Sequence, residues 1–194
     1  MLTPCRRTGR FLGVFMQKKS LLMDEADVRR ALMRIAHEII EKNKGTDNIC
    51  LVGIKRRGVP LAQQIGANIT KIEDTLLPCA ELDIHGYRDD ITTDTNTAKK
   101  AVLPFDITDK TVILVDDVLY TGRTVRAAIE AIFSMGRPRA IQLAILIDRG
   151  HRELPIRADF VGKNIPSAHT ERIYVKMPPL DDVTCVELWQ KDDK

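Results

Sequence analysis

The stretch that decides the fold covers residues 112–124 and reads VILVDDVLYTGRT. Four apolar residues run directly into the adjacent carboxylates Asp116 and Asp117, and a short segment with one glycine and three hydroxyl side chains follows. Residues 122–135 then carry apolar side chains at the spacing of a helix. We therefore expect a short buried strand, a polar loop and a helix, in that order.

The same order of strand, loop and helix occurs earlier in the chain. Residues 49–54 (ICLVGI) are apolar throughout, as in a fully buried strand, and a basic turn and a helix from residue 59 to about residue 68 follow. Residues 24–43 have the pattern of an amphipathic helix, and residues 140–147 that of another strand. Repeated units of this kind predict an α/β fold with a mostly parallel central sheet flanked by helices.

The remaining segments are shorter or more polar. Residues 76–84 fit a further strand, and three shorter β-like segments follow late in the chain, at residues 158–162, 172–176 and 182–188. Residues 85–104 are polar and rich in threonine, and they exceed the roughly 12–15 residues beyond which a loop is usually functional or disordered. This long loop is a candidate lid.

Length and composition favour one domain. The chain has 194 residues, of which 44% are hydrophobic, and this is enough for one substantial core. Residues 1–15 are basic, and their apolar part is shorter than the roughly 7–15 residues in the hydrophobic region of a signal peptide. We expect residues 1–15 to be a disordered extension and residues 16–194 a single domain, with Met16 as a candidate start.

Cysteine usage and hydropathy indicate a cytoplasmic protein. The four cysteines are scattered along the chain without C-x-x-C spacing, so neither a zinc site nor a disulfide framework is indicated. No apolar run approaches the roughly 18 residues of a membrane span. The net charge of +3 does not by itself require a nucleic acid partner.

The aspartate pair and the loop after it predict a site for a ribose phosphate. Ligands of an open parallel sheet bind beyond the C-terminal ends of its strands, where Asp116 and Asp117 are expected. The backbone N–H groups of residues 118–124 and the hydroxyls of Thr121 and Thr124 can converge on an anion at the start of the helix. The carboxylates can accept hydrogen bonds from neighbouring ribose hydroxyls. An Asx-type turn is the alternative for the two aspartates alone.

The residues of this stretch resemble the phosphoribosyl diphosphate (PRPP) signature of type I phosphoribosyltransferases. Residues 126–166, from RAAIEAIF to GKNIP, closely resemble the PyrR family of pyrimidine operon attenuation regulators. The segments RRALMRIAHEIIEKNKG, LVGIKRRG and LDIHGYRDD are similar to the same family, so the resemblance extends from about Met16 to the end of the chain. It implies a type I phosphoribosyltransferase-like fold with a small β-containing hood.

The resemblance also implies two activities. One is uracil phosphoribosyltransferase chemistry, in which uracil and PRPP give UMP and pyrophosphate with the help of Mg²⁺. The other is binding to pyr leader RNA, promoted by uridine nucleotides, which favours transcription termination. The family further suggests a homo-oligomer, either a dimer or a larger assembly.

Transfer of the ribose requires groups that position the substrate and neutralise charge on the departing pyrophosphate. Asp116 and Asp117 are candidates for the ribose and, through substrate or water, for Mg²⁺. The basic residues 55–57 follow a strand end and are candidates for the pyrophosphate, although a solvated basic turn is the alternative. The expected catalytic residues are Asp116, Asp117, Arg57 and Arg88, the last from the segment YRDD that opens the long loop. The expected PRPP- and nucleotide-binding residues are Lys55, Arg56, Arg57, Gly58, Asp116, Asp117, Val118, Leu119, Tyr120, Thr121, Gly122, Arg123 and Thr124.

Residue 120 indicates which base is accepted. Purine-specific relatives typically place an aspartate where this chain has Tyr120, and a tyrosine cannot act as a carboxylate base. A pyrimidine acceptor is therefore expected. Val161, in the segment DFVGKN, is expected to contact the ring, although it fits an ordinary strand core equally well.

Basic residues on two segments are candidates for RNA contacts. Arg30, Arg34 and His37 share one face of the first predicted helix, and they have the composition of a solvated face with i, i+4 ion pairs. The family resemblance instead implies an RNA-binding surface. Its expected members are Arg34, His37, His151, Arg152, Arg157 and Lys163.

Three functions remain open at this point. The first is a bifunctional enzyme and RNA attenuator, the second an enzyme that only salvages uracil or a purine, and the third a regulator without catalysis. Tyr120 argues against purine use, and the intact aspartate pair argues against lost catalysis. The first is our prediction.

Overall fold

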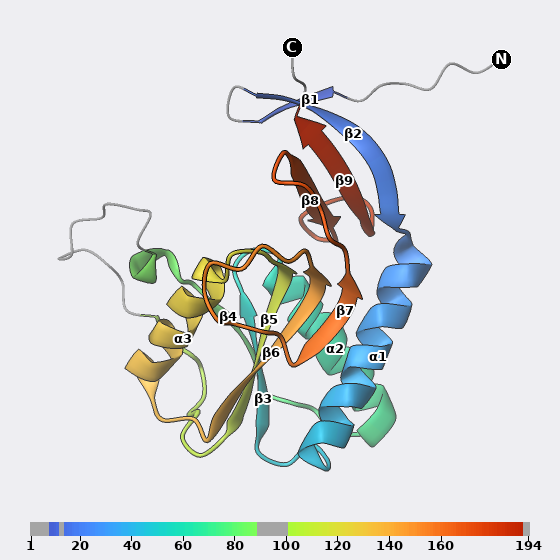
Figure 1. Cartoon of the computed structure of the whole chain (residues 1–194). Helices are drawn as coiled ribbons and strands as arrows, with labels where there is room; N and C mark the ends of the chain where they lie inside the picture. Colours follow the sequence, from blue (N-terminus) through green and yellow to red (C-terminus); the bar gives the residue numbers. More distant parts are fainter. Residues whose placement is uncertain (1–7, 12–13, 89–100, 192–194) are drawn as a thin grey trace.

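The core of the protein is a five-stranded parallel sheet (Figure 1). The computed structural model describes residues 8–11, 14–88 and 101–191. All four neighbouring strand pairs of this sheet are parallel, which confirms the predicted α/β fold. In spatial order the strands are β4 (Cys79–Leu82), β3 (Ile49–Ile54), β5 (Thr111–Leu119), β6 (Ala140–Asp148) and β7 (Phe160–Asn164).

Helices cover both faces of the parallel sheet (Figure 1). The helices α1 (Glu25–Asn43) and α2 (Gly58–Glu73) share one hydrophobic cluster with the inward side chains of the sheet. The helix α3 (Arg123–Met135) packs into a second cluster on the opposite face. A short 3₁₀ turn, η1 (His85–Tyr87), leads out of the sheet toward the long loop. The predicted layers of helix, sheet and helix are confirmed.

The predicted hood is a separate antiparallel sheet that stands above the C-terminal ends of the parallel strands (Figure 1). It contains β1 (Thr8–Phe11), β2 (Val14–Met23), β9 (Cys185–Lys191) and β8 (Glu171–Lys176), in that spatial order. The chain enters α1 directly from β2, where Asp24 caps the helix by accepting a hydrogen bond of 2.7 Å from the Asp27 N–H. The two sheets are thus joined at the start of α1.

The N-terminal segment differs from the sequence expectation. Residues 8–11 form β1 and pair with residues 14–17 of β2, where a disordered extension was expected over residues 1–15. Pairing satisfies backbone groups along the edge of β2 that would otherwise be left open. Residues 1–7 and 12–13 lie outside the described part of the chain.

A membrane span is not found: among the described residues, no helix combines sufficient length with sufficient apolar character.

Two glycines bring the β3–α2 turn against β5. A Cβ atom on Gly53 would lie 2.6 Å from the carbonyl oxygen of Gly58, and a Cβ atom on Gly58 would lie 2.3 Å from that of Val115. The same Gly58 Cβ atom would lie 3.3 Å from the Asp116 Cα atom. The basic turn that precedes Gly58 therefore lies beside the aspartates of β5.

We expect Gly58→Ala to destabilise the protein and to displace this turn, because the added methyl group overlaps a backbone oxygen that cannot rotate away. Overpacking of this kind costs about 1–3 kcal/mol, and in a domain of this size each kcal/mol lowers Tm by roughly 2–4 °C. Gly66→Ala in the same helix is the control, since its Cβ atom would meet only the Leu51 Cδ1 atom, at 3.0 Å. Equal melting temperatures of the two variants would contradict this packing.

Candidate functional site

Asp116 and Asp117 lie within β5, close to its C-terminal end. The strand continues to Leu119, beyond the predicted end at residue 115, so both carboxylates are held by strand geometry. The Asp117 N–H donates a hydrogen bond of 2.9 Å to Asp116 Oδ1, and the Val118 N–H donates one of 2.9 Å to Asp117 Oδ1. Asp116 is only 7% exposed. The pair is fixed in place by the backbone that follows it.

Burial makes the negative charge of this pair costly. It raises the pKa of Asp116 well above its ordinary value, and the neighbouring Asp117 charge adds to this shift. Burial also raises the pKa of Asp117, against the opposing effects of the Val118 N–H hydrogen bond and the Arg57 charge. Hydroxyl donors or a cation would compensate this charge, and both occur in a metal-bound ribose diphosphate.

The loop after the pair leads to the open N-terminus of α3. Gly122 precedes the helix with φ +94°, a left-handed conformation that favours glycine, and the Arg123 N–H donates a hydrogen bond of 3.3 Å to Thr121 Oγ1. The Thr121 carbonyl accepts hydrogen bonds from the N–H groups of Glu153 and Leu154, at 3.0 and 3.1 Å. The loop is therefore anchored to the β6–β7 connection, and the first N–H groups of α3 remain suited to an anion.

The three basic residues of the β3–α2 turn have different surroundings. Lys55 forms an ion pair of 2.7 Å with Glu81, and this hydrogen bond raises the pKa of the Lys55 ammonium group. Arg57 forms an ion pair of 2.5 Å with Asp181 of the β8–β9 connection. Arg56 is exposed and has no hydrogen bond or ion pair with any described residue. Among the three, Arg56 is the cation most available to a ligand.

Tyr120 belongs to a cluster of aromatic and basic side chains that the sequence did not reveal. Its hydroxyl lies 3.1 Å from His169 Nδ1, and the Arg149 guanidinium lies 4.1 Å from its ring centroid. The rings of His151 and His169 have centroids 4.1 Å apart. The position of Arg149, directly after the end of β6, was a usable signal, whereas His169 lies in a connection that has no motif.

Two polar atoms in this cluster are buried without a hydrogen-bond partner among the described residues. They are Arg149 Nε and Ser167 Oγ. Arg149 is 7% exposed, and burial lowers the pKa of its guanidinium. Its Nη2 atom donates to the carbonyls of Ala168 and Glu171, at 3.0 and 3.1 Å. Buried polar atoms without a partner are energetically unfavourable, so a polar partner for either atom would stabilise this cluster.

Val161, the expected base contact, lies elsewhere. It occupies the second position of β7, three residues before the strand ends, and its carbonyl accepts a hydrogen bond of 3.0 Å from Arg34 of α1. The Tyr120 cluster instead lies among the loops that follow β5, β6 and β7. The nucleotide loop and the β7–β8 connection thus bring Tyr120 and His169 together, whereas Val161 lies within β7.

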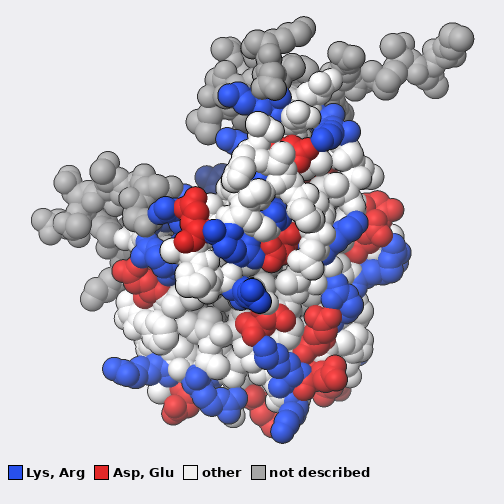
Figure 2. Space-filling view, viewed as in Figure 1, with Lys and Arg blue, Asp and Glu red and all other residues white. Residues whose placement is uncertain are grey.

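The two basic segments proposed for RNA adjoin along β7. Arg34 Nη2 donates to the carbonyls of Val161 and Gly162, at 3.0 and 2.6 Å, and so covers the outer edge of the sheet. Lys163 Nζ donates to the Leu22 carbonyl at 3.1 Å. His37 is exposed and lies on the same face of α1 as Arg34. Figure 2 shows basic and acidic side chains interspersed on the face that it displays.

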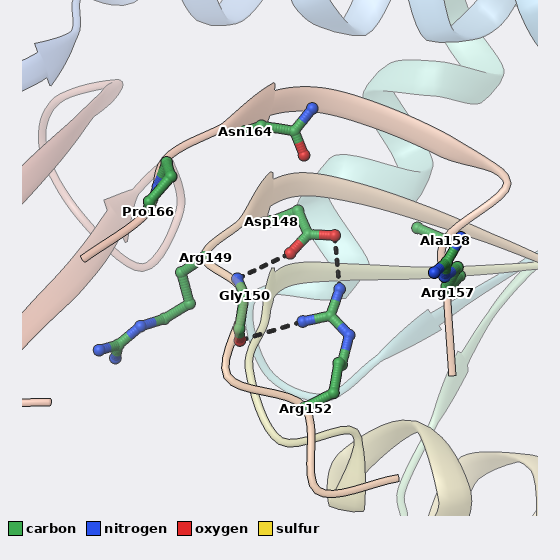
Figure 3. A pocket seen from close by; sticks show the side chains of 8 residues that line it. All are labelled: Asp148, Arg149, Gly150, Arg152, Arg157, Ala158, Asn164 and Pro166. Carbon is green, nitrogen blue, oxygen red and sulfur yellow. Dashed lines mark hydrogen bonds and ion pairs between the residues drawn. The ribbon is translucent and has the colours of Figure 1, made fainter. Parts of the chain in front are cut away.

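Arg152 differs from the other proposed RNA contacts because its guanidinium is only partly exposed and is held by several hydrogen bonds within the protein. It lines a pocket of about 360 Å³ with Asp148, Arg157 and Asn164, and Figure 3 shows it turned toward Asp148 and Gly150. Its Nη2 atom lies 2.5 Å from Asp148 Oδ2, and its Nη1 atom donates to the Tyr120 carbonyl at 2.9 Å. Arg152 therefore helps to hold the nucleotide loop in place through the Tyr120 carbonyl. Arg157 and His151 are exposed.

The start of the long loop is anchored to α3. The Tyr87 hydroxyl lies 2.7 Å from Ser134 Oγ, and Arg126 Nη2 donates to the Tyr87 carbonyl at 3.0 Å. Arg88 is exposed at the end of η1, and the candidate lid at residues 89–100 lies outside the described part of the chain.

A closed metal site is not found among the described residues, since no group of three or more His, Cys, Asp or Glu side chains could hold a metal ion. The aspartate pair supplies two carboxylates. This donor set fits a hard cation that keeps water or substrate oxygens as its remaining ligands.

The raised pKa of Asp116 leads to a prediction about stability. The folded chain binds more protons than the unfolded chain between the unfolded value of 3.8 and the higher folded value, so stability falls as pH rises through this window. Asp116→Asn removes this loss and keeps the oxygen that accepts the Asp117 N–H. We expect the variant to melt above the wild type at pH 7, with a difference that shrinks below about pH 4. Thermal melts across pH test this, and a variant that melts lower at pH 7 would contradict it.

Comparisons with known proteins agree with this geometry. Residues 22–179 match the phosphoribosyl transferase domain family. The chain is 56% identical over 179 residues to the bifunctional protein PyrR of Caldicellulosiruptor bescii, and the match covers 91% of this chain and 98% of that protein. It is 57% identical over 177 residues to the bifunctional protein PyrR of Brevibacillus brevis, covering 90% and 99%.

Solved structures show the same fold at lower identity. A hypoxanthine phosphoribosyltransferase from Staphylococcus aureus is 22% identical with a TM-score of 0.68, and the match covers 90% of this chain and 92% of that one. The enzyme from Trypanosoma cruzi in complex with its product IMP is 16% identical with a TM-score of 0.68, covering 89% and 91%. The predicted family and fold class are both confirmed. The chain belongs to the PyrR family and carries a phosphoribosyl transferase domain.

Proposed function

We propose that this protein transfers ribose 5-phosphate from PRPP to uracil, giving UMP and pyrophosphate. The observation that carries the proposal is the buried aspartate pair at the end of β5, placed between the open N-terminus of α3 and the basic β3–α2 turn. PRPP has a 5-phosphate, vicinal hydroxyls and a diphosphate in that order. The three parts of the site match these groups.

The 5-phosphate binds the loop of residues 120–124, where backbone N–H groups and the Thr121 and Thr124 hydroxyls surround it. The ribose hydroxyls then donate to Asp116 and Asp117. Binding replaces the repulsion between two buried carboxylates with hydrogen bonds. The ribose ring is thereby held with its anomeric carbon toward the basic turn.

The pyrophosphate leaves toward the β3–α2 turn, where Arg56 supplies an exposed positive charge and Lys55 a second one that is shared with Glu81. We propose that Arg88, which is exposed at the end of η1, adds a third. Mg²⁺, held through the aspartates and substrate oxygens, would neutralise charge on the diphosphate. These groups stabilise the charge that develops as the anomeric C–O bond breaks.

The acceptor base binds beside Tyr120, in the region where His169 and Ser167 come from the β7–β8 connection. Arg149 Nε and Ser167 Oγ are buried without a partner among the described residues, and a shift of either side chain on binding would bring a donor or acceptor to the base edge. A phenol at residue 120 does not serve as a carboxylate base toward a purine. This arrangement favours a pyrimidine.

Asp117→Asn tests the assignment of the ribose site. We expect kcat for UMP formation from uracil and PRPP to fall by about 10²-fold or more, because a charged acceptor is lost where the transition state needs it. The folded state should persist, as judged by circular dichroism. Wild-type turnover in this variant would sink the assignment, and faster turnover of hypoxanthine than of uracil by the wild type would contradict the choice of base.

A second function is supported by the basic residues around β7. The relatives described above carry the name bifunctional protein PyrR, Arg34 and Lys163 lie along β7 at the outer edge of the parallel sheet, and His37 and Arg157 are exposed. We propose that this edge binds the phosphates of a pyrimidine-gene leader RNA and that uridine nucleotides promote the binding. Arg152 acts differently from these four, because its contacts hold the nucleotide loop.

Arg157→Ala separates the two functions, because Arg157 is exposed while the Arg152 guanidinium is held by hydrogen bonds within the protein. We expect the affinity for a leader hairpin to fall by about 10-fold, and the slope of log affinity against log salt to decrease by about 1. UMP formation should remain near the wild-type rate. The matched control is Arg137→Ala, an exposed arginine at the opposite end of the sheet. Filter binding with and without UMP measures this, and equal losses in both variants would contradict the surface.

A further inference from the structure

The hood is tied to the basic turn by one ion pair. Arg57 Nη1 lies 2.5 Å from Asp181 Oδ2, and Arg57 Nη2 lies 3.4 Å from Asp181 Oδ1. The Arg57 Nη1 atom also donates to the Val175 carbonyl of β8. One side chain of the turn therefore contacts a hood strand and the connection that follows it.

The carboxylate of this pair is itself held in place. The Met177 N–H donates a hydrogen bond of 3.1 Å to Asp181 Oδ2, so the β8–β9 connection folds around the carboxylate. The side chains of Arg57 and Asp181 are 33% and 19% exposed. Although burial opposes it, the hydrogen bond from Arg57 holds the pKa of Asp181 below its ordinary value. Asp181 is therefore a charged partner at neutral pH, in a partly enclosed place.

The other side of the turn is also fixed. Gly58 is packed against the Val115 carbonyl of β5, directly beside Asp116. Residues 55–57 are thus held between β5 and the hood, and the Arg57 charge acts on Asp117 from this position. The two contacts together hold the backbone from which the Arg56 side chain extends, and that side chain has no partner among the described residues.

We propose that Asp181 is a positioning residue for diphosphate recognition. This role rests on the proposed transferase function. Arg57 holds the hood and the turn together, whereas Arg56 and the backbone of the turn contact the diphosphate directly. Asp181 does not touch the substrate. It acts through Arg57 by keeping the turn in the geometry that the diphosphate requires, and small displacements of such groups are costly for binding and rate.

The test is Asp181→Asn, which keeps an oxygen for the Met177 N–H and removes the charge. We expect KM for PRPP to rise by about 10-fold or more, and KM for uracil to change by less than about two-fold. Asp182→Asn is the matched control, because it removes the same charge from the next residue, which is exposed. Arg57→Lys should give the same PRPP-specific effect, and the double variant should be no worse than the poorer single variant.

Several outcomes would overturn the inference. They are an unchanged KM for PRPP in Asp181→Asn, an equal rise in the KM of both substrates, and additive losses in the double variant. If Asp181→Asn does not fold, Arg57→Lys alone decides the question by the same comparison of the two KM values. Calorimetric titration with PRPP keeps the two proposals separate, because it needs no turnover. A wild type that binds PRPP but forms no UMP would contradict the proposed reaction, while weaker PRPP binding in Asp181→Asn would still support its positioning role.

Discussion

The adjacent carboxylates near the end of β5, Asp116 buried and Asp117 half-buried, are the constraint on which the rest of the site depends. An isolated buried charge is costly: burial raises the pKa of both carboxyl groups, and the Asp117 charge raises the pKa of Asp116 further. Among the described residues the fold supplies little compensation: each carboxylate accepts a hydrogen bond from the N–H group of the next residue, Asp117 for Asp116 and Val118 for Asp117. The basic turn lies beside Asp116, and the loop that follows the pair leads to the N-terminus of α3. Stability is thus given up at a place where a substrate with hydroxyls and a bound cation restores it.

The hood strand β8 and the connections on either side of it fix the positions of three loops around the pair. Arg57 joins the basic turn to β8 and Asp181, Arg149 joins the end of β6 to the Ala168 and Glu171 carbonyls, and Tyr120 joins the nucleotide loop to His169. Loops at the ends of the strands are ordinarily more mobile than the strands themselves. Here, contacts with a second sheet fix their relative positions, so the same hood can influence the phosphate, the ribose and the base.

Local patterns in the sequence predicted much of the fold. The apolar strands at residues 49–54 and 140–147 and the first helix were recognisable because their residues have one environment along the whole element. The aspartate pair was found because the position of a strand end determines where a ligand binds. The strand at residues 8–11 was missed because its stability comes from pairing with β2, which itself pairs with β9 at the other end of the chain.

Side-chain direction was the main limit of the sequence analysis. Arg152 looked like a surface contact, but its guanidinium turns inward to Asp148 and the Tyr120 carbonyl. Arg57 looked like a direct pyrophosphate ligand, but it is paired with Asp181, a residue more than a hundred positions later. Such pairings follow from tertiary contacts between distant segments, and no spacing rule contains them.

The most direct test of this account is an NMR titration of the Asp116 and Asp117 side-chain carboxyl carbons, with and without Mg²⁺ and PRPP. The account predicts that both carboxyl groups titrate above the ordinary aspartate range in the free protein, and that both pKa values fall when PRPP and Mg²⁺ bind. Ordinary pKa values in the free protein, unchanged by PRPP and Mg²⁺, would contradict the claim that this buried pair is built for the ribose of a phosphorylated substrate.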